Sequence, residues 1–234
     1  MQLIKPFWVH HEGHSIYSID FQPSENRFVT GGQGGNGSGL VILWNLKPLI
    51  DSKAENDNAV PKLLCRLDSH VACVNCVRWC GTGKYLASAG DDKTIMIWHF
   101  AGRTAGLKSF SGGDSSLFPN AELWKCSSVL NGHSGDVLHL AWSTGDTYLA
   151  SCSVDNSVIV WNALRFPEKV VVLQGHQGLV KGVCWDPLGK YLASQVLWHR
   201  YLYFRLQLIV GRRQNGAYLG NVQLVPDQNH LQAV

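Results

Sequence analysis

Short apolar stretches separated by Gly- and Asp-containing turns recur along the chain, and three of them align without gaps. Each copy begins at a histidine, namely His70, His133 or His176. An aliphatic residue follows four positions on, another apolar residue at seven and a tryptophan at nine. Nine residues further, each copy reaches the serine of a Tyr-Leu-Ala-Ser segment, namely Ser88, Ser151 or Ser194. A spacing that is kept at this many positions indicates internal structural repeats.

The first two of these copies continue through a tight turn to a second tryptophan. Asp92 lies six residues before Trp98, and Asp155 lies six residues before Trp161. The apolar stretches are about five residues long and rich in β-branched and aromatic side chains, which predicts strands. Gly and Asp occupy the turns because they tolerate the positive φ angles that tight turns require.

Each copy therefore predicts three strands followed by a fourth. In the copy that begins at His70, we expect strands near residues 73–79, 84–89 and 94–98. A short apolar stretch before the next histidine supplies the fourth strand. These stretches lie near residues 63–67, 128–130 and 170–173, before His70, His133 and His176. Four-stranded units that begin near a histidine and end near a tryptophan resemble WD repeats, which are the blades of a β-propeller.

A further copy lies at the N-terminus, where the apolar offsets fit only if Glu12 takes the position of the repeat histidine. The apolar and hydroxyl positions of the repeat then fall at Ile16, Ile19, Phe21 and Thr30. The step from Thr30 to Trp44 is four residues longer than elsewhere, and the excess lies in the Gly-rich segment 31–39. Thr30 and Trp44 thus take the positions of the repeat serine and the second tryptophan, and they form a partial set of the repeated polar residues.

Together the copies predict an all-β chain that forms part of a WD40-type β-propeller, with three full blades and part of a fourth in an open ring. We expect the blades near residues 12–67, 70–130, 133–173 and 176–195, and the last one keeps only the partial set His176 and Ser194. An open ring leaves apolar faces and strand edges exposed at both ends. We therefore expect the chain by itself to aggregate rather than to form a stable monomer.

The sequence departs from the repeat after Gln195. Residues 196–234 do not match the repeat, and Phe204 stands where a second tryptophan is expected. We interpret this segment as a divergent tail of unknown structure. Its apolar run at 196–210 is about 15 residues long and contains two arginines, whereas a membrane span needs about 20 apolar residues.

The repeated polar positions form two complete sets, His70, Ser88, Asp92, Trp98 and His133, Ser151, Asp155, Trp161. The resemblance to WD repeats implies hydrogen-bonded tetrads, in which Asp holds His, His reaches Ser, and Ser accepts from the indole N–H. A Ser-His-Asp hydrolase is the alternative interpretation. Its nucleophile must be open to substrate, however, and a catalytic set would not recur as a scaffold element does. We predict structural tetrads and no catalytic residue.

Three other patterns carry weaker signals. Cys73, Cys76 and Cys80 include one zinc-like pair but no second pair, and strand residues three apart point to opposite faces. The Gly-rich segment 31–39 is followed by a strand, whereas a dinucleotide site needs a helix there. A loop cluster without an apparent carboxylate partner consists of His10, His11 and His14. We predict neither a metal nor a cofactor.

Composition narrows the class of partner. The formal net charge of +3 is too small to indicate a polyanion, so we expect neither sequence-specific nucleic-acid binding nor a membrane. Seven cysteines without a compact framework, and a start without an apparent secretory signal, favour free thiols in a reducing compartment.

Longer segments resemble the N-terminal propeller of the histone regulator A (HIRA) family. They are HVACVNCVRW, YLASAGDDKTIMIW, NGHSGDVLHLAWS, YLASCSVDNSVIVWNA and GHQGLVKGVCWDPLGKYLASQ, together with the opening KPFWVHHEGHSIYSIDFQP. Insertions near residues 48–61 and 101–122 match that family in position as well. Because insertions between blades differ among propellers, they discriminate better than the tetrads do.

The resemblance implies a nuclear scaffold of a replication-independent histone chaperone complex, which acts in nucleosome assembly and in chromatin and transcription regulation, including repression. It also implies a ubinuclein-type partner, with histones engaged indirectly. The alternative is a generic WD-repeat adaptor, such as a ubiquitin-ligase substrate receptor or a trafficking subunit. A propeller enzyme would need carboxylates or histidines that converge on the central channel, and no such cluster stands out.

Overall fold

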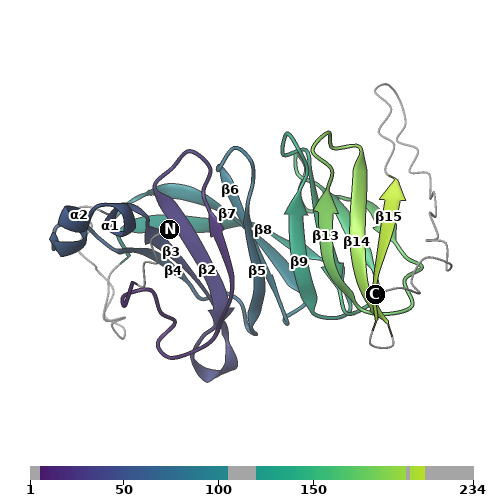
Figure 1. Cartoon of the computed structure of the whole chain (residues 1–234), viewed down its shortest axis with the longest axis horizontal. Helices are drawn as coiled ribbons and strands as arrows, with labels where there is room; N and C mark the ends of the chain where they lie inside the picture. Colours follow the sequence, from purple (N-terminus) through teal and green to yellow (C-terminus); the bar gives the residue numbers. More distant parts are fainter. Residues whose placement is uncertain (1–5, 105–119, 199–200, 209–234) are drawn as a thin grey trace, which may run out of the picture.

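The computed structural model describes residues 6–104, 120–198 and 201–208 of the chain. Within these ranges the strands form four antiparallel sheets that follow one another in chain order (Figure 1). The first sheet consists of β1 (Ile16–Phe21), β2 (Arg27–Gln33), β3 (Gly39–Asn45) and β4 (Leu63–Leu67). The second consists of β5 (Val74–Trp79), β6 (Tyr85–Gly90), β7 (Thr94–Arg103) and β8 (Glu122–Asn131).

The third sheet repeats this arrangement, and the fourth has three strands among the described residues. The third consists of β9 (Val137–Trp142), β10 (Tyr148–Ser153), β11 (Val158–Asn162) and β12 (Lys169–Leu173). The fourth consists of β13 (Val180–Trp185), β14 (Tyr191–Trp198) and β15 (Tyr201–Leu208). Within each sheet, neighbouring strands are consecutive in the sequence. The prediction of an all-β, partial and open propeller is confirmed.

Helical structure in the described part is confined to connections. A short turn, η1 (Gly35–Gly37), joins β2 to β3, so the Gly-rich segment is an elongated turn between strands. The insertion before β4 contains α1 (Lys47–Ile50) and α2 (Ser52–Asn56). The Asp51 side chain caps α2, since it accepts a hydrogen bond from Lys53 N at 2.9 Å. None of the helices in the described ranges has the length and apolar character needed to cross a bilayer.

The second sheet extends further than the repeat predicts. We expected its third strand to end near residue 98 and its fourth to begin near 128. Instead, β7 and β8 stay paired from Thr94 and Asn131 out to Arg103 and Glu122. The insertion between these strands continues the hairpin, because each added pair satisfies further backbone hydrogen bonds. Residues 105–119 of the insertion lie outside the described residues.

The fourth sheet also continues beyond Gln195, where the repeat pattern ends. β14 runs to Trp198, and β15 pairs with it from Tyr191 opposite Leu208 to Trp198 opposite Tyr201. Backbone pairing needs neither the Asp turn nor the second tryptophan, so a strand can be added without them. The rest of the predicted tail, residues 199–200 and 209–234, lies outside the described residues.

Apolar side chains of neighbouring sheets meet in a buried layer between each successive pair. Between the first and second sheets, Val41 and Leu43 lie in one cluster with Val74, Val77 and Trp79. Burial of one such side chain contributes about 1.5–3 kcal/mol. Because these residues are buried by the neighbouring sheet, each sheet depends on the next for its stability.

The first sheet carries an apolar stripe, Ile16, Ile19 and Phe21 of β1, whose side chains are 40%, 51% and 52% exposed. In strand register Ile16 and Ile19 correspond to Val74 and Val77 of β5, which are fully buried. The difference arises because β5 packs against the first sheet, whereas among the described residues no sheet precedes β1. This is the exposed apolar face that an open ring predicts.

Candidate functional site

The second sheet holds a complete His-Ser-Asp-Trp network. His70 Nδ1 lies 2.7 Å from Asp92 Oδ2, and His70 Nε2 lies 2.7 Å from Ser88 Oγ. The indole N–H of Trp98 donates to the same serine oxygen at 2.8 Å. β6 and β7 supply the serine and the tryptophan, and the turn between these strands supplies the aspartate. The hydrogen bonds therefore connect this turn to the loop that leads into β5.

The third sheet repeats the network with nearly the same geometry. His133 Nδ1 lies 3.0 Å from Asp155 Oδ2, and His133 Nε2 lies 2.8 Å from Ser151 Oγ. The Trp161 indole donates to Ser151 Oγ at 2.9 Å. Equal sequence spacing thus produces equal geometry in the two sheets.

The turn aspartates are held by more than their histidines. Asp155 accepts hydrogen bonds from Ser157 Oγ at 2.6 Å and from Ser134 N at 2.8 Å. Burial alone would raise its pKa, but the bonds from Ser157, Ser134 and His133 outweigh burial and lower that pKa to about 2. Burial also lowers the pKa of His133, which opposes its protonation. An ionised aspartate beside a neutral histidine places the ring proton on Nδ1 and leaves Nε2 to accept from the serine hydroxyl.

This order of atoms matches a Ser-His-Asp triad, but the surroundings differ from those of an active site. Ser88 and Ser151 are fully buried, and each accepts an indole N–H. A nucleophilic oxygen must be reachable by substrate, and its lone pairs must be free to attack. The arrangement instead satisfies four polar side chains within a sheet, as a structural element does.

The first sheet contains a shorter network, and its histidine is His11 instead of a residue at position 12. His11 Nε2 lies 2.9 Å from Thr30 Oγ1, which also accepts from the Trp44 indole at 2.8 Å. Glu12 is exposed and pairs with Arg66. The assignment of Glu12 to the histidine position was therefore wrong.

A tight turn explains the one-residue shift. Glu12 and Gly13 have φ angles of 53° and 88°, and His14 N donates to His11 O at 2.9 Å across them. This turn absorbs one extra residue between the histidine and β1, so the strand register is kept while the histidine moves back by one. The sequence did contain signals for the correct assignment, namely a histidine at position 11 and a glycine, typical of turns, at position 13. Fixed residue offsets missed them because they allow no extra residue between the histidine and the strand.

The fourth sheet keeps the partial set. His176 Nε2 lies 2.8 Å from Ser194 Oγ, and Ser194 is buried. The sequence count placed the second tryptophan position at residue 204, but the strand register does not: residue 204 lies opposite Gln195. The residue opposite Leu192 is 207, and this is the position at which Trp98 lies opposite Leu86 in the second sheet. The contact between His176 and Ser194 is thus made in a sheet whose third strand follows a different sequence pattern.

The remaining sequence candidates differ in burial: Cys73 is half-buried, and His10 and His14 are exposed. Cys76 and Cys80 are buried, and Cys76 belongs to the apolar cluster between the second and third sheets. Burial raises the pKa of the Cys76 thiol, which disfavours the thiolate that a metal requires. Within the described residues, no group of three or more His, Cys, Asp or Glu side chains is arranged to hold a metal ion.

Sequence spacing did not reveal the polar contacts that join neighbouring sheets. The Trp142 indole donates to Arg78 O at 3.1 Å, and the Trp185 indole donates to Ala141 O at 3.0 Å. Each of these tryptophans is the first one of its repeat, and each reaches back to the innermost strand of the preceding sheet. In the third and fourth sheets the first tryptophan therefore joins neighbouring sheets, while the second tryptophan of a complete repeat serves the network within its sheet. The corresponding indole nitrogen of Trp79 in the second sheet is buried without a hydrogen-bond partner among the described residues.

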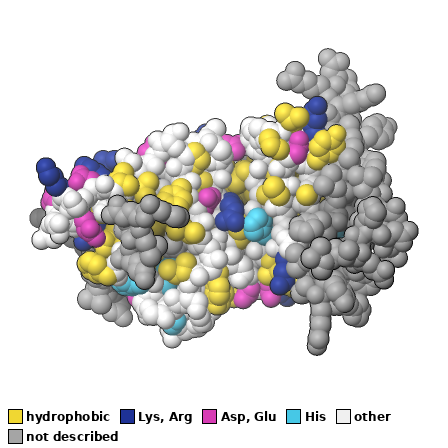
Figure 2. Space-filling model, in the orientation of Figure 1, with side chains coloured by type: hydrophobic (Ala, Val, Ile, Leu, Met, Phe, Trp, Pro, Cys, Tyr) yellow, Lys and Arg dark blue, Asp and Glu magenta, His cyan; other side chains and the backbone are white. Residues whose placement is uncertain are grey.

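Charges are dispersed over the described part of the face shown in Figure 2. Figure 2 shows Lys, Arg, Asp and Glu side chains interspersed with polar and hydrophobic groups on the face that it presents. A protein that binds nucleic acid through phosphate contacts gathers Lys and Arg on one face. The described part of this face has no such cluster.

Comparison with known proteins gives a consistent picture. The family model for the CAF1B/HIR1 beta-propeller domain matches residues 1–207. Protein HIRA of Homo sapiens is 53% identical over 168 residues, which are 72% of this chain and 16% of that protein. Protein HIRA of Xenopus laevis is 52% identical over 168 residues, which are likewise 72% of this chain and 16% of that protein. Protein HIR1 of Cryptococcus neoformans is 43% identical over 203 residues, which cover 83% of this chain and 22% of that protein. The chain thus spans less than a quarter of the length of these relatives.

Proposed function

Because the chain belongs to the CAF1B/HIR1 β-propeller family, we propose that it is a non-catalytic interaction scaffold of a histone chaperone complex. The observation that carries this proposal is the match of the family model to residues 1–207, together with relatives named Protein HIRA at about half identity. The scaffold acts in nucleosome assembly and transcription regulation, in the nucleus. Its partner is a ubinuclein-type subunit, and histones join the assembly through other subunits.

The buried networks support the non-catalytic part of the proposal. The serines that resemble nucleophiles are fully buried in the second and third sheets. A hydrolase assay with a small activated ester tests this part, because such esters report weak nucleophiles. We expect the chain and its Ser151→Ala variant to give the same rate. A rate that falls with Ser151→Ala, in a variant that stays folded, would contradict the proposal.

Capture from nuclear extract tests the scaffold role. The tagged chain is incubated with extract, and the retained proteins are identified by mass spectrometry. We expect a ubinuclein-type subunit together with histones. Enrichment of cullin or coat components instead would favour the generic WD-repeat adaptor. A variant with His70→Ala and His133→Ala, which loosens two sheets, serves as the control for binding that does not need the folded scaffold.

A further inference from the structure

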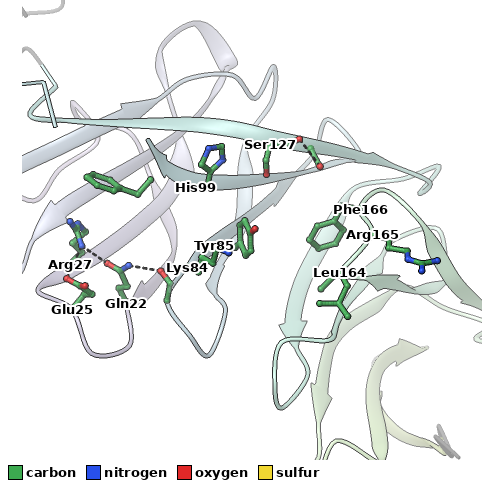
Figure 3. A pocket seen from close by; sticks show the side chains of 14 residues that line it. Gln22, Glu25, Arg27, Lys84, Tyr85, His99, Ser127, Leu164, Arg165 and Phe166 are labelled. Atoms are coloured by element: carbon green, nitrogen blue, oxygen red, sulfur yellow. Dashed lines mark hydrogen bonds and ion pairs between the residues drawn. The ribbon is translucent and has the colours of Figure 1, made fainter. Parts of the chain in front are cut away.

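A cavity of about 580 Å³ opens where connections of the first three sheets come together (Figure 3). Its lining comes from the turn between β1 and β2, the turn between β5 and β6, parts of β7 and β8, and the loop after β11. This volume is within the range of ligand pockets, which is about 300–1,000 Å³. Neither the buried networks nor the exposed apolar stripe contributes a side chain to it.

One wall of the pocket is held in place by hydrogen bonds. Gln22 Nε2 donates to Gly83 O at 2.7 Å, which ties the turn of the first sheet to that of the second. The Arg27 guanidinium donates through Nε and Nη2 to Glu122, at 3.0 and 2.8 Å, and lies over the Phe100 ring at 5.3 Å. Groups that are fixed in advance lose little freedom when a ligand binds. This wall of the pocket is therefore preformed.

The pocket also offers an apolar surface. Phe166 contacts Trp142 edge to face at 6.1 Å, which fixes one ring in the wall. Phe100 and Leu164 line the same pocket and are 41% and 77% exposed. Figure 3 shows Leu164 and Phe166 on the loop after β11, across the pocket from Arg27 and Gln22. Exposed large apolar side chains in a concave site favour contact with an apolar group of a partner.

The charges of the pocket are unbalanced. Glu25 and Glu122 are both engaged by Arg27. Lys84 and Arg165 are exposed lining residues, and neither forms an ion pair within the described part of the chain. Arg27, Lys84 and Arg165 thus stand against two carboxylates, which leaves one excess positive charge. An excess positive charge beside an apolar surface complements a ligand that carries a carboxylate.

His99 adds a hydrogen-bonding group. It lines the pocket, and its Nδ1 atom is buried without a hydrogen-bond partner among the described residues. Because Nδ1 has almost no accessible surface, a ligand can contact this half-buried ring only through its other atoms. A peptide backbone, which has both an N–H and a C=O in every residue except proline, can pair with either tautomer of the ring.

We propose that this pocket binds an extended peptide segment of a partner protein, in which an acidic residue adjoins a large apolar side chain. The apolar side chain contacts Phe100, Leu164 and Phe166, and the carboxylate lies near Lys84 and Arg165. A single-stranded nucleic acid fits less well, because two free cations neutralise few phosphates. The inference goes beyond the scaffold role and does not depend on which complex the chain joins.

Selection from a displayed library of random heptapeptides tests the proposal on the full chain. We expect enriched peptides to carry Asp or Glu next to Leu, Phe, Tyr or Met. Their affinity should fall at least tenfold for the double variant Lys84→Glu and Arg165→Glu, and several-fold for Leu164→Ser. All three residues are exposed, so these variants should keep the melting temperature of the parent chain.

A variant with the same change in charge, Lys53→Glu and Lys181→Glu, is the matched control, since both residues are exposed and lie outside the pocket lining. It should bind the selected peptides as the parent chain does. Three results would overturn the proposal: no enrichment on the parent chain, enriched peptides without acidic residues, or equal loss of affinity in the matched control. Tighter binding of a polythymidine oligonucleotide than of the peptides, again dependent on Lys84 and Arg165, would also overturn it.

Discussion

The Asp20 carboxylate accepts a hydrogen bond of 2.7 Å from the backbone N–H of Trp79, and this bond joins β1 of the first sheet to β5 of the second. The nearby Ser18 hydroxyl accepts from Val77 N at 3.1 Å. These bonds satisfy backbone donors of the strand edge that faces the neighbouring sheet. Polar side chains on the innermost strand thus supplement the apolar layer between sheets.

Replacing Asp20 with alanine should lower the free energy of unfolding by about 1–3 kcal/mol, because Trp79 N would lose its acceptor in a partly buried position. Urea denaturation followed by tryptophan fluorescence measures this change. Asp68→Ala removes an exposed carboxylate and is the matched control, expected to change stability by less than about 0.5 kcal/mol. Equal effects of the two substitutions would show that the bond to Trp79 N is not stabilising.

The first sheet makes a direct comparison between neighbouring residues possible. His11→Ala should destabilise the chain by about 1–3 kcal/mol, because Thr30 Oγ1 would lose a buried partner. Glu12→Ala removes only an exposed ion pair with Arg66, which is worth about 0–1 kcal/mol. Thermal melts of the two variants decide between the positions. A larger loss for Glu12→Ala would reverse our assignment of the network.

In the third sheet, His133→Ala should cost about 1–3 kcal/mol, since it leaves Asp155 and Ser151 without their shared partner. The midpoint of equilibrium denaturation measures the effect. His14→Ala, at an exposed position, serves as the control and should leave the midpoint in place. An unchanged midpoint for His133→Ala would count against a stabilising network there, and the same result at His70 would count against it in both sheets.

Acid should destabilise the fold through buried histidines. Burial lowers the pKa of His11 to about 4, and burial together with the adjacent Arg78 lowers the pKa of His139 to about 4. An unfolded histidine titrates near pH 6.5, so between pH 6.5 and 4 the unfolded chain binds more protons than the folded chain. Stability is therefore greatest above pH 6.5 and falls as the pH drops through this window.

Melting temperatures between pH 7.5 and 5 test this prediction, with a loss of about 2–4 °C for each kcal/mol of destabilisation. His139 Nε2 lies 3.0 Å from Arg78 Nη2, and a glutamine side chain can still accept from the guanidinium without titrating. His139→Gln should therefore show a smaller drop in melting temperature than the parent chain. An identical drop in both proteins would assign the acid sensitivity to other groups.

The apolar stripe of β1 should cause association of the 234-residue chain when it is produced by itself. Ile19 and Phe21 are about half exposed, and large apolar contacts between copies would remove them from water. The double variant Ile19→Ser and Phe21→Ser should sediment with less associated material than the parent chain. Val71→Ser, which removes an isolated exposed apolar side chain, is the control. A parent chain that sediments as a monomer with a sharp cooperative melt would contradict this prediction.

Residue spacing alone predicted the first three sheets, the first two strands of the fourth, and the His-Ser-Asp-Trp networks of the second and third sheets. A blade is a local unit whose strands are consecutive in the sequence, so its apolar periodicity and turn residues lie within one stretch of the chain. The offsets from His70 to Ser88 and Trp98 therefore predicted the hydrogen-bond partners that the second sheet brings together. The same offsets failed at His11, because a turn can absorb an extra residue without changing the strand that follows.

Contacts between sheets were decided only by the tertiary structure. Asp20 and Trp79, or Gln22 and Gly83, are about 60 residues apart, and no periodicity in the sequence relates the members of either pair. The pocket around His99 likewise combines turns of three sheets, so its charge balance depends on how the blades stack. The addition of β15 to the fourth sheet was also beyond the repeat pattern, because strand pairing uses backbone groups that every such sequence carries. Short-range spacing therefore determined the blades, and packing between blades determined the surfaces that a partner can reach.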